Sequence, residues 1–182
     1  MSENTSPVPG ATDSDPSAGS GESRVVSASR VIQAPAVRIF ELIAEPTQQP
    51  RWDGNGNLQQ AEEGQRVHAV GDVFAMLNTS GKVRENYVVA FEEGREIAWK
   101  PGGQGEEPAG HRWGWRLEPQ GDDVTLVEHT YDWSELTDER RFEKARSTTA
   151  EMLMASIDRL AELAESGGAG HVDPDGGTDT VG

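Results

Sequence analysis

The sequence predicts an α+β fold, in which a curved antiparallel sheet of about six or seven strands wraps around a long C-terminal helix. Three observations support this class. Short, β-branched segments separated by Gly- and Ser-containing turns fill the middle of the chain. Two short helical segments follow the first strand, and the apolar period becomes helical near residue 137. Helices gathered on one side of an antiparallel sheet define an α+β domain.

The two ends of the chain differ in composition from its middle. The protein has 182 residues and a net charge of −16, from 16 Lys and Arg against 32 Asp and Glu. Residues 1–23 contain no Lys or Arg, and residues 166–182 are rich in Gly and Asp. Such segments bury too little apolar surface to offset their ordering entropy. We therefore expect disordered acidic tails flanking one domain over residues 24–165.

Charge, hydropathy and the lack of cysteine together exclude several classes of protein. Nucleic-acid binding needs clustered cations, and the basic residues here are scattered and outnumbered. No apolar run approaches the ~20 residues of a spanning helix, so no membrane insertion is expected. The N-terminus lacks the pattern of a signal peptide. With no cysteine, disulfide and thiolate chemistry are excluded. We expect a cytoplasmic protein, and the excess of Arg over Lys favours a bacterial source.

The ordered region begins with a strand over residues 25–33, which is β-branched and Ser-rich. A helix is expected from Pro35, at its first position, to Ala44, with Pro46 ending it. Thr47 is a candidate N-cap for a short helical turn before Trp52. The remaining predicted strands are residues 57–63, 72–78, 82–92, 96–100, 111–118 and 124–133.

The C-terminal segment predicts a single helix of about 28 residues, or roughly 40 Å. Thr137 is its expected N-cap, and it ends near Glu165, before a Ser-Gly-Gly sequence. One face carries the stripe Phe142, Ala145, Thr149, Leu153, Ser156, Leu160 and Leu163. The small polar members of this stripe leave space opposite the sheet.

Strand alternation predicts which side chains face that helix. The odd-numbered residues of the later strands are assigned to the concave face: Tyr87, Val89, Phe91, Ile97, Trp99, His111, Trp113, Trp115, Leu117, Thr125, Val127, His129, Tyr131 and Trp133. Two interpretations remain open for this aromatic face. It is either a filled core with internal hydrogen bonds, or an amphipathic pocket whose few polar groups orient a ligand.

Four segments together resemble a known superfamily. They are residues 29–35 (SRVIQAP), 46–53 (PTQQPRWD), 91–99 (FEEGREIAW) and 130–133 (TYDW). Their order and spacing are similar to those of START/SRPBCC proteins, whose architecture is the helix-grip fold. Bacterial polyketide cyclase/dehydratase-like members look most similar, and the resemblance covers about residues 25–165.

The resemblance implies a cavity between the sheet and the long helix that binds a small hydrophobic or aromatic molecule, such as a lipid or polyketide. The superfamily has no universal catalytic residue, so catalytic residues stay unassigned. The candidate ligand-binding residues are Trp52, Phe74, Tyr87, Val89, Trp99, His111, Trp113, Trp115, His129, Tyr131, Thr149 and Leu153. No cofactor is expected, and the chain is expected to be a monomer or weak homodimer.

His111 and His129 share the predicted concave face, which leaves three roles open. They can form a hydrogen-bonded pocket pair, act in acid–base chemistry, or bind a metal with Glu85 as third ligand. We expect no metal site. Residues 53–57 begin like a calcium loop but lack its later Gly and Glu, so they predict a Gly-rich turn.

Three functions are compatible with the sequence. The first is a carrier or sensor of a small hydrophobic or aromatic molecule, which we favour. The second is a polyketide cyclase, aromatase or dehydratase acting in the same cavity. The third is a protein-interaction module. Within the cavity, we expect His129 to be the interior polar group and Tyr131 to form wall near the mouth.

Overall fold

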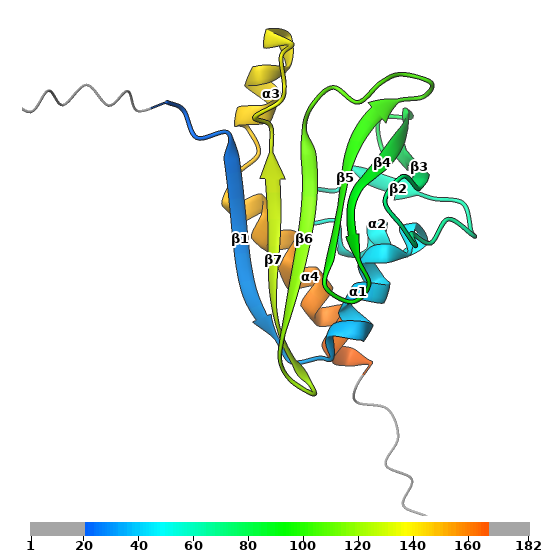
Figure 1. The fold of residues 1–182 in the computed structure, drawn as a ribbon, viewed down its shortest axis with the longest axis vertical. Coiled ribbons are helices and arrows are strands. Elements are labelled where there is room, and N and C mark those ends of the chain that lie inside the picture. The colour runs from blue at the N-terminus through cyan, green and yellow to red at the C-terminus, as the bar shows by residue number, and fades with distance from the viewer. Residues whose placement is uncertain (1–20, 168–182) are drawn as a thin grey trace, which may run out of the picture.

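The computed structural model describes residues 21–167 (Figure 1). Its strands are β1 (Val25–Ile32), β2 (Leu58–Gln60), β3 (Val73–Asn78), β4 (Val83–Glu92), β5 (Glu96–Gly103), β6 (Arg112–Gly121) and β7 (Val124–Asp132). Its helices are α1 (Ala36–Ala44), η1 (Pro46–Gln48), α2 (Gln49–Trp52), η2 (Glu139–Arg141), α3 (Phe142–Arg146) and α4 (Ala150–Ser166).

All seven strands form one antiparallel sheet in the order β1-β7-β6-β5-β4-β3-β2. The sheet curves around α4, which lies across β1, β7 and β6 in Figure 1 and packs against α1 and α2. Apolar residues of α1 and α4 meet the sheet in one core, which includes Phe40, Ile97 and Ile157. The predicted α+β, helix-grip architecture is confirmed.

The β6–β7 hairpin follows the predicted alternation closely. Trp115 and Leu117 of β6 are buried, whereas Arg116 between them is exposed. In β7, Val127 and His129 are buried on either side of exposed Glu128. Because side chains of a regular strand alternate between faces, this hairpin presents one aromatic face to α4 and one charged face to solvent.

The prediction for β4 was wrong at two positions. The pairing of β4 with β5 shifts register between Val88 and Ala90, which is a β-bulge at Val89. A bulge adds one residue to one strand and so reverses the alternation beyond it. Asn86 and Val88 are therefore the buried residues, while Tyr87 and Val89 lie on the outer face; Val89 is 38% exposed. Phe91, beyond the bulge, packs against the core as predicted.

The single long C-terminal helix was also wrong, because the chain breaks into η2, α3 and the 17-residue α4. The break falls at residues 147–149, a Ser-Thr-Thr sequence whose hydroxyls compete with helical backbone bonding. Ser147 Oγ donates to the carbonyl of Lys144, and Thr149 caps α4 by accepting from the amide of Met152. Asp138, rather than Thr137, caps η2.

Smaller differences concern the other caps and the termini. Pro35 is the N-cap residue of α1. Gln48, rather than Thr47, is the N-cap residue of α2, and Glu45 caps the preceding η1. The expected tails, residues 1–23 and 166–182, lie outside the described residues except at 21–23 and 166–167. Glu22 forms an ion pair with Arg146. No helix within residues 21–167 is long and apolar enough to cross a membrane.

Candidate functional site

A cavity of about 470 Å³ lies between the sheet and the C-terminal helices. Its wall is drawn from α2 and the turn after it, from β3 to β7, and from α3, α4 and their connection. This volume is in the range of pockets that enclose small organic ligands. The cavity occupies the place that the resemblance implied, and its two sides differ in chemistry.

The β6–β7 side is a continuous aromatic wall. His129 stacks on Trp115 with ring centroids 3.7 Å apart and 9° between the planes. Trp113 follows, 5.7 Å from His129 and 4.4 Å from Tyr131, and His111 lies 6.0 Å from Tyr131. Pairing of the two strands sets this order, since Trp115 lies opposite His129 and Trp113 opposite Tyr131. All five residues line the cavity.

Two further tryptophans complete the aromatic lining. Trp52 donates from Nε1 to the carbonyl of Leu42 at 2.7 Å and meets Trp115 edge to face at 5.1 Å. Trp99 meets Phe74 edge to face at 5.4 Å. Trp52 and Trp99 line the cavity, while Phe74 is buried behind Trp99. These contacts fix the orientation of both indole rings, because Trp52 is held by the Leu42 carbonyl and Trp99 packs against Phe74.

His129 is the deeper of the two cavity histidines and is buried. Its Nδ1 is 2.9 Å from the carbonyl oxygen of Gly114, so Nδ1–H is the donor and Nε2 carries the lone pair. Burial lowers the pKa of His129 to about 4, although the bond with Gly114 acts in the opposite direction. His129 is therefore a neutral imidazole at pH 7.

His111 lies one aromatic layer away from His129, beside Tyr131. Burial lowers the pKa of His111 to about 4, and the positive charges of Arg141, Arg84 and Lys144 add to that effect. Burial raises the pKa of Tyr131. At neutral pH, both groups are uncharged and able to form hydrogen bonds with a polar atom in the cavity.

The suggested metal set does not assemble. Glu85 is not part of the cavity wall, because its carboxylate accepts from Tyr87 Oη and from the amide of Gly105. Within residues 21–167, no three His, Asp or Glu side chains lie close enough to hold a metal ion. The interleaved Trp113–Tyr131 pair separates the two histidines along the strands.

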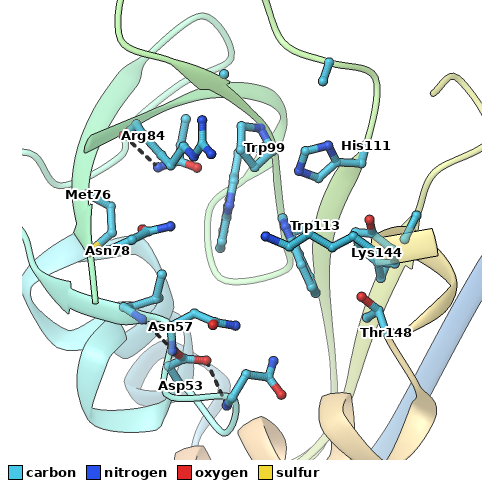
Figure 2. A pocket seen from close by; sticks show the side chains of 18 of the residues that line it. Asp53, Asn57, Met76, Asn78, Arg84, Trp99, His111, Trp113, Lys144 and Thr148 are labelled. Carbon is cyan, nitrogen blue, oxygen red and sulfur yellow. Dashed lines mark hydrogen bonds between the residues drawn. The ribbon is translucent and has the colours of Figure 1, made fainter. Parts of the chain in front are cut away.

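The turn after α2 forms the floor of the opposite side. Asp53 is buried, and its carboxylate accepts from the amides of Asn55, Asn57 and Leu58 at 2.5 to 3.1 Å. The Asp53 carboxylate therefore organises the Gly-rich turn predicted there. Gly54 lets this turn contact α4 closely, since a Cβ would lie 2.5 Å from the backbone of Ala155. Figure 2 shows Asp53 and Asn57 on this side.

Seven of the candidate residues line the cavity: Trp52, Trp99, His111, Trp113, Trp115, His129 and Tyr131. The other five do not. Phe74 and Leu153 are buried outside its wall, Thr149 is exposed as the cap of α4, and Tyr87 and Val89 lie on the outer face. The sequence reasoning missed several polar lining residues, among them Asn86, Arg84, Arg141, Lys144 and Thr148. Asn86 and Arg84 are even-numbered residues of β4, and the even-numbered residues before the bulge at Val89 face inward. Simple alternation without that bulge assigned them to the outer face.

Residues 23–165 match the family described as polyketide cyclase / dehydrase and lipid transport. The chain belongs to this family. The START/SRPBCC resemblance is thus confirmed, since this family is of that type and the fold agrees. Two proteins of Mycobacterium tuberculosis, both described as uncharacterized, are similar to this chain in sequence: one is 27% identical over 112 residues, and the other is 30% identical over 110 residues. Each alignment covers 59% of this chain and 47% of the relative, so the chain spans about half the length of these curated relatives.

Solved structures share the fold at low identity. Norcoclaurine synthase of Thalictrum flavum, in complex with a transition-state analogue, superposes with a TM-score of 0.55 at 13% identity, over 80% of this chain and 96% of that one. A protein of Chromobacterium violaceum gives 0.57 at 18%, over 79% and 99%. Ginseng major latex-like protein 151 of Panax ginseng gives 0.52 at 17%, over 77% and 96%. At these identities, the likenesses show the fold of this chain and nothing about its activity.

Proposed function

We propose that this protein binds a small hydrophobic or aromatic molecule, such as a lipid or polyketide, in the cavity between the sheet and α4. One observation carries the proposal: four of the five tryptophans of the chain line a single cavity of about 470 Å³. A filled core of aromatic side chains leaves few voids larger than a water molecule. A space of this size walled by indole rings instead favours a flat or apolar guest.

A polar atom of such a ligand has potential hydrogen-bond partners in the cavity wall. Trp115 Nε1–H is buried and has no acceptor among residues 21–167. An unpaired buried donor costs about 1–3 kcal/mol, which a bound acceptor or water recovers. His129 Nε2 has the complementary role, because Nδ1 already donates to Gly114. A ligand with both donor and acceptor groups therefore suits the deep end of the cavity.

The same geometry favours a carrier or sensor over a cyclase or dehydratase. General acid–base catalysis works best with groups whose pKa lies near the working pH. Here the pKa of His111 and of His129 is lowered to about 4, while burial raises that of Tyr131. The pKa values of these three groups are thus shifted away from neutrality, which suits hydrogen bonding to a ligand more than proton transfer.

Displacement of a fluorescent probe tests the proposal. N-phenyl-1-naphthylamine, a neutral aromatic probe, is expected to bind the purified protein with a large rise in emission. Thr148 lines the cavity at the α3–α4 connection (Figure 2), so Thr148→Phe fills part of the space. Thr130→Phe makes the same change on β7, away from the cavity wall, and serves as the matched control.

We expect Thr148→Phe to weaken probe binding at least tenfold and Thr130→Phe to leave it within twofold. Equal binding by both variants would place the probe elsewhere and contradict the proposal. Native mass spectrometry of protein purified from its own host then identifies the natural guest, because a tightly held ligand co-purifies.

A further inference from the structure

Positive charge gathers at one end of the cavity, although the chain as a whole carries −16. Arg84 enters from β4, and Arg141 and Lys144 enter from η2 and α3. Figure 2 shows the Lys144 side chain extending into the cavity toward Trp113. His111 lies on the same side of the cavity as Lys144, and Arg84 lies across from them. The three cations come from segments nearly 60 residues apart in sequence, so the fold rather than local composition brings them together.

Two of these cations have no acidic partner in the described part of the chain. Arg141 forms an ion pair with Asp138, with 3.5 Å between Nε and Oδ2. Within residues 21–167, neither Arg84 nor Lys144 forms an ion pair or donates a side-chain hydrogen bond. Several cations on the outer surface do have such partners, among them Arg66 with Glu41 and Glu93. Arg84 and Lys144 therefore line the cavity without an acidic partner among the described residues.

Within the described residues, the acids in the cavity wall form no ion pair with these three cations. Asp53 already accepts three backbone amides. Glu106 and Glu107 lie in the β5–β6 loop, and the Glu106 carboxylate rests against Gly103. Within the described part of the chain, neither glutamate is ion-paired with Arg84, Arg141 or Lys144. The lowered pKa of His111, caused first by burial and then by Arg141, Arg84 and Lys144, is consistent with a positive field at this end.

We infer that the ligand carries an acidic group, a carboxylate, sulfonate or phosphate, held between Arg84 and Lys144, with its aromatic or apolar body against Trp113 and Trp115. This inference rests on the proposed function and names the class of guest. Arg and Lys give their strongest hydrogen bonds to such anions. Partial exclusion of water from the cavity strengthens the attraction relative to bulk solvent.

Two probes with one ring system separate charge recognition from apolar binding. The probe 8-anilinonaphthalene-1-sulfonate differs from N-phenyl-1-naphthylamine by its sulfonate. The ratio of their affinities is measured by fluorescence titration for wild type, Arg84→Gln and Lys144→Gln. Arg95→Gln is the control, because Arg95 follows the far end of β4, is exposed and changes the net charge equally. Melting temperatures are recorded for all variants.

We expect Arg84→Gln and Lys144→Gln each to lower the ratio of sulfonate to neutral affinity about tenfold, the effect of losing one charge-assisted hydrogen bond. The neutral probe should bind all variants within twofold, and Arg95→Gln should keep the wild-type ratio. Melting temperatures should change little, since neither cation has a side-chain partner among the residues that the structure describes. Lys144 lines the cavity from the solvent-exposed helix α3, so its variant tests the inference even if Arg84→Gln fails to fold.

Other results overturn the inference in distinguishable ways. If the neutral probe binds but the ratio is the same in all four proteins, the cavity takes uncharged guests and the proposed function stands. If Arg95→Gln lowers the ratio as much as the cavity variants, the effect is one of net charge alone. If neither probe binds wild type, both the acidic guest and the proposed function are wrong.

Discussion

The two walls of the cavity are built by different rules. In the β6–β7 wall, the two strands pair without a register shift from Arg112 to Pro119. Trp113 and Trp115 of β6 face the cavity at every second position, and His111, just before the strand, continues the series. The β3–β4 wall includes a bulge at Val89 and presents Met76, Arg84 and Asn86 instead of aromatic rings. The regular wall supplies flat apolar surface, and the bulged wall supplies polar groups and charge.

The polarity of this pocket comes from the wall in which strand alternation is broken. Alternation along an unbroken strand keeps an apolar set on one face, and a single extra residue exchanges the faces. Before the bulge, the inward residues of β4 are Arg84, Asn86 and Val88. After it, Phe91 returns to the core. The bulge thus lets one strand line a polar cavity end and still seal the apolar core.

The largest effect is expected in the regular wall, from Trp115→Ala. Trp115 is buried, stacks on His129 and meets Trp52 edge to face. Truncating a large core aromatic costs about 3–5 kcal/mol. The neighbouring Arg116→Ala, on the exposed face, should cost less than about 0.5 kcal/mol. Urea unfolding measures both values. A cost below about 1 kcal/mol for Trp115→Ala would mean that the wall is not packed as described.

A pH-dependent effect of intermediate size is expected from His129. Its folded pKa is about 4, below the ordinary value near 6.5, so between those pH values the unfolded chain binds a proton that the folded chain does not. Stability is therefore lost as pH falls below about 6.5. At 1.36 kcal/mol per pH unit, the loss reaches about 2 kcal/mol by pH 5.

The measurement compares the free energy of unfolding at pH 7 and pH 5 for wild type, His129→Gln and His68→Gln. His129→Gln should lose about 2 kcal/mol less between the two pH values than wild type does. His68 is exposed, so its variant should follow wild type. Identical slopes for wild type and His129→Gln would show that the His129 imidazole is not held neutral in the folded protein.

Adjacent valines test the bulge in the other wall. Val88 is 2% exposed and Val89 is 38% exposed. Val88→Ala should cost about 2 kcal/mol, from two buried methyl groups and the space they leave. Val89→Ala should cost less than about 0.5 kcal/mol. Thermal and urea unfolding of the two variants measure both costs in free energy of unfolding. A reversed ranking would restore the simple alternation that the sequence predicted for β4.

The inward-facing residues of the β6–β7 wall could be predicted from the sequence, whereas those of the bulged β4 could not. Regular alternation made the inward set of β6 and β7 readable from the sequence, from Trp113 to Tyr131. The bulge was not readable, because Val88-Val89-Ala90 offers three similar apolar residues and the extra residue is set by pairing with β5. The break between α3 and α4 was hidden likewise, since Thr149 fits either a helical stripe or a cap.

The polar end of the site was beyond sequence reasoning for a related reason. Arg84, Arg141 and Lys144 belong to segments distant in the chain, and each alone reads as an ordinary surface cation. Only the curvature of the sheet and the turn into α3 bring them to one cavity. By contrast, the aromatic wall is local to one hairpin, so neighbouring positions in sequence are also neighbours in the site.

The smallest effects are expected at the threonine pair of the α3–α4 break, and they separate a cap from a cavity residue. Thr149 caps α4, whereas Thr148 lines the cavity. Thr149→Ala should cost about 1 kcal/mol, because it removes the acceptor for the Met152 amide, and Thr149→Ser should restore most of it. Neither should alter binding of N-phenyl-1-naphthylamine. Thr148→Ala should alter probe affinity by a few-fold with little change in stability. If instead Thr149→Ala weakens the probe at unchanged stability, Thr149 belongs to the site, as an unbroken helix would place it.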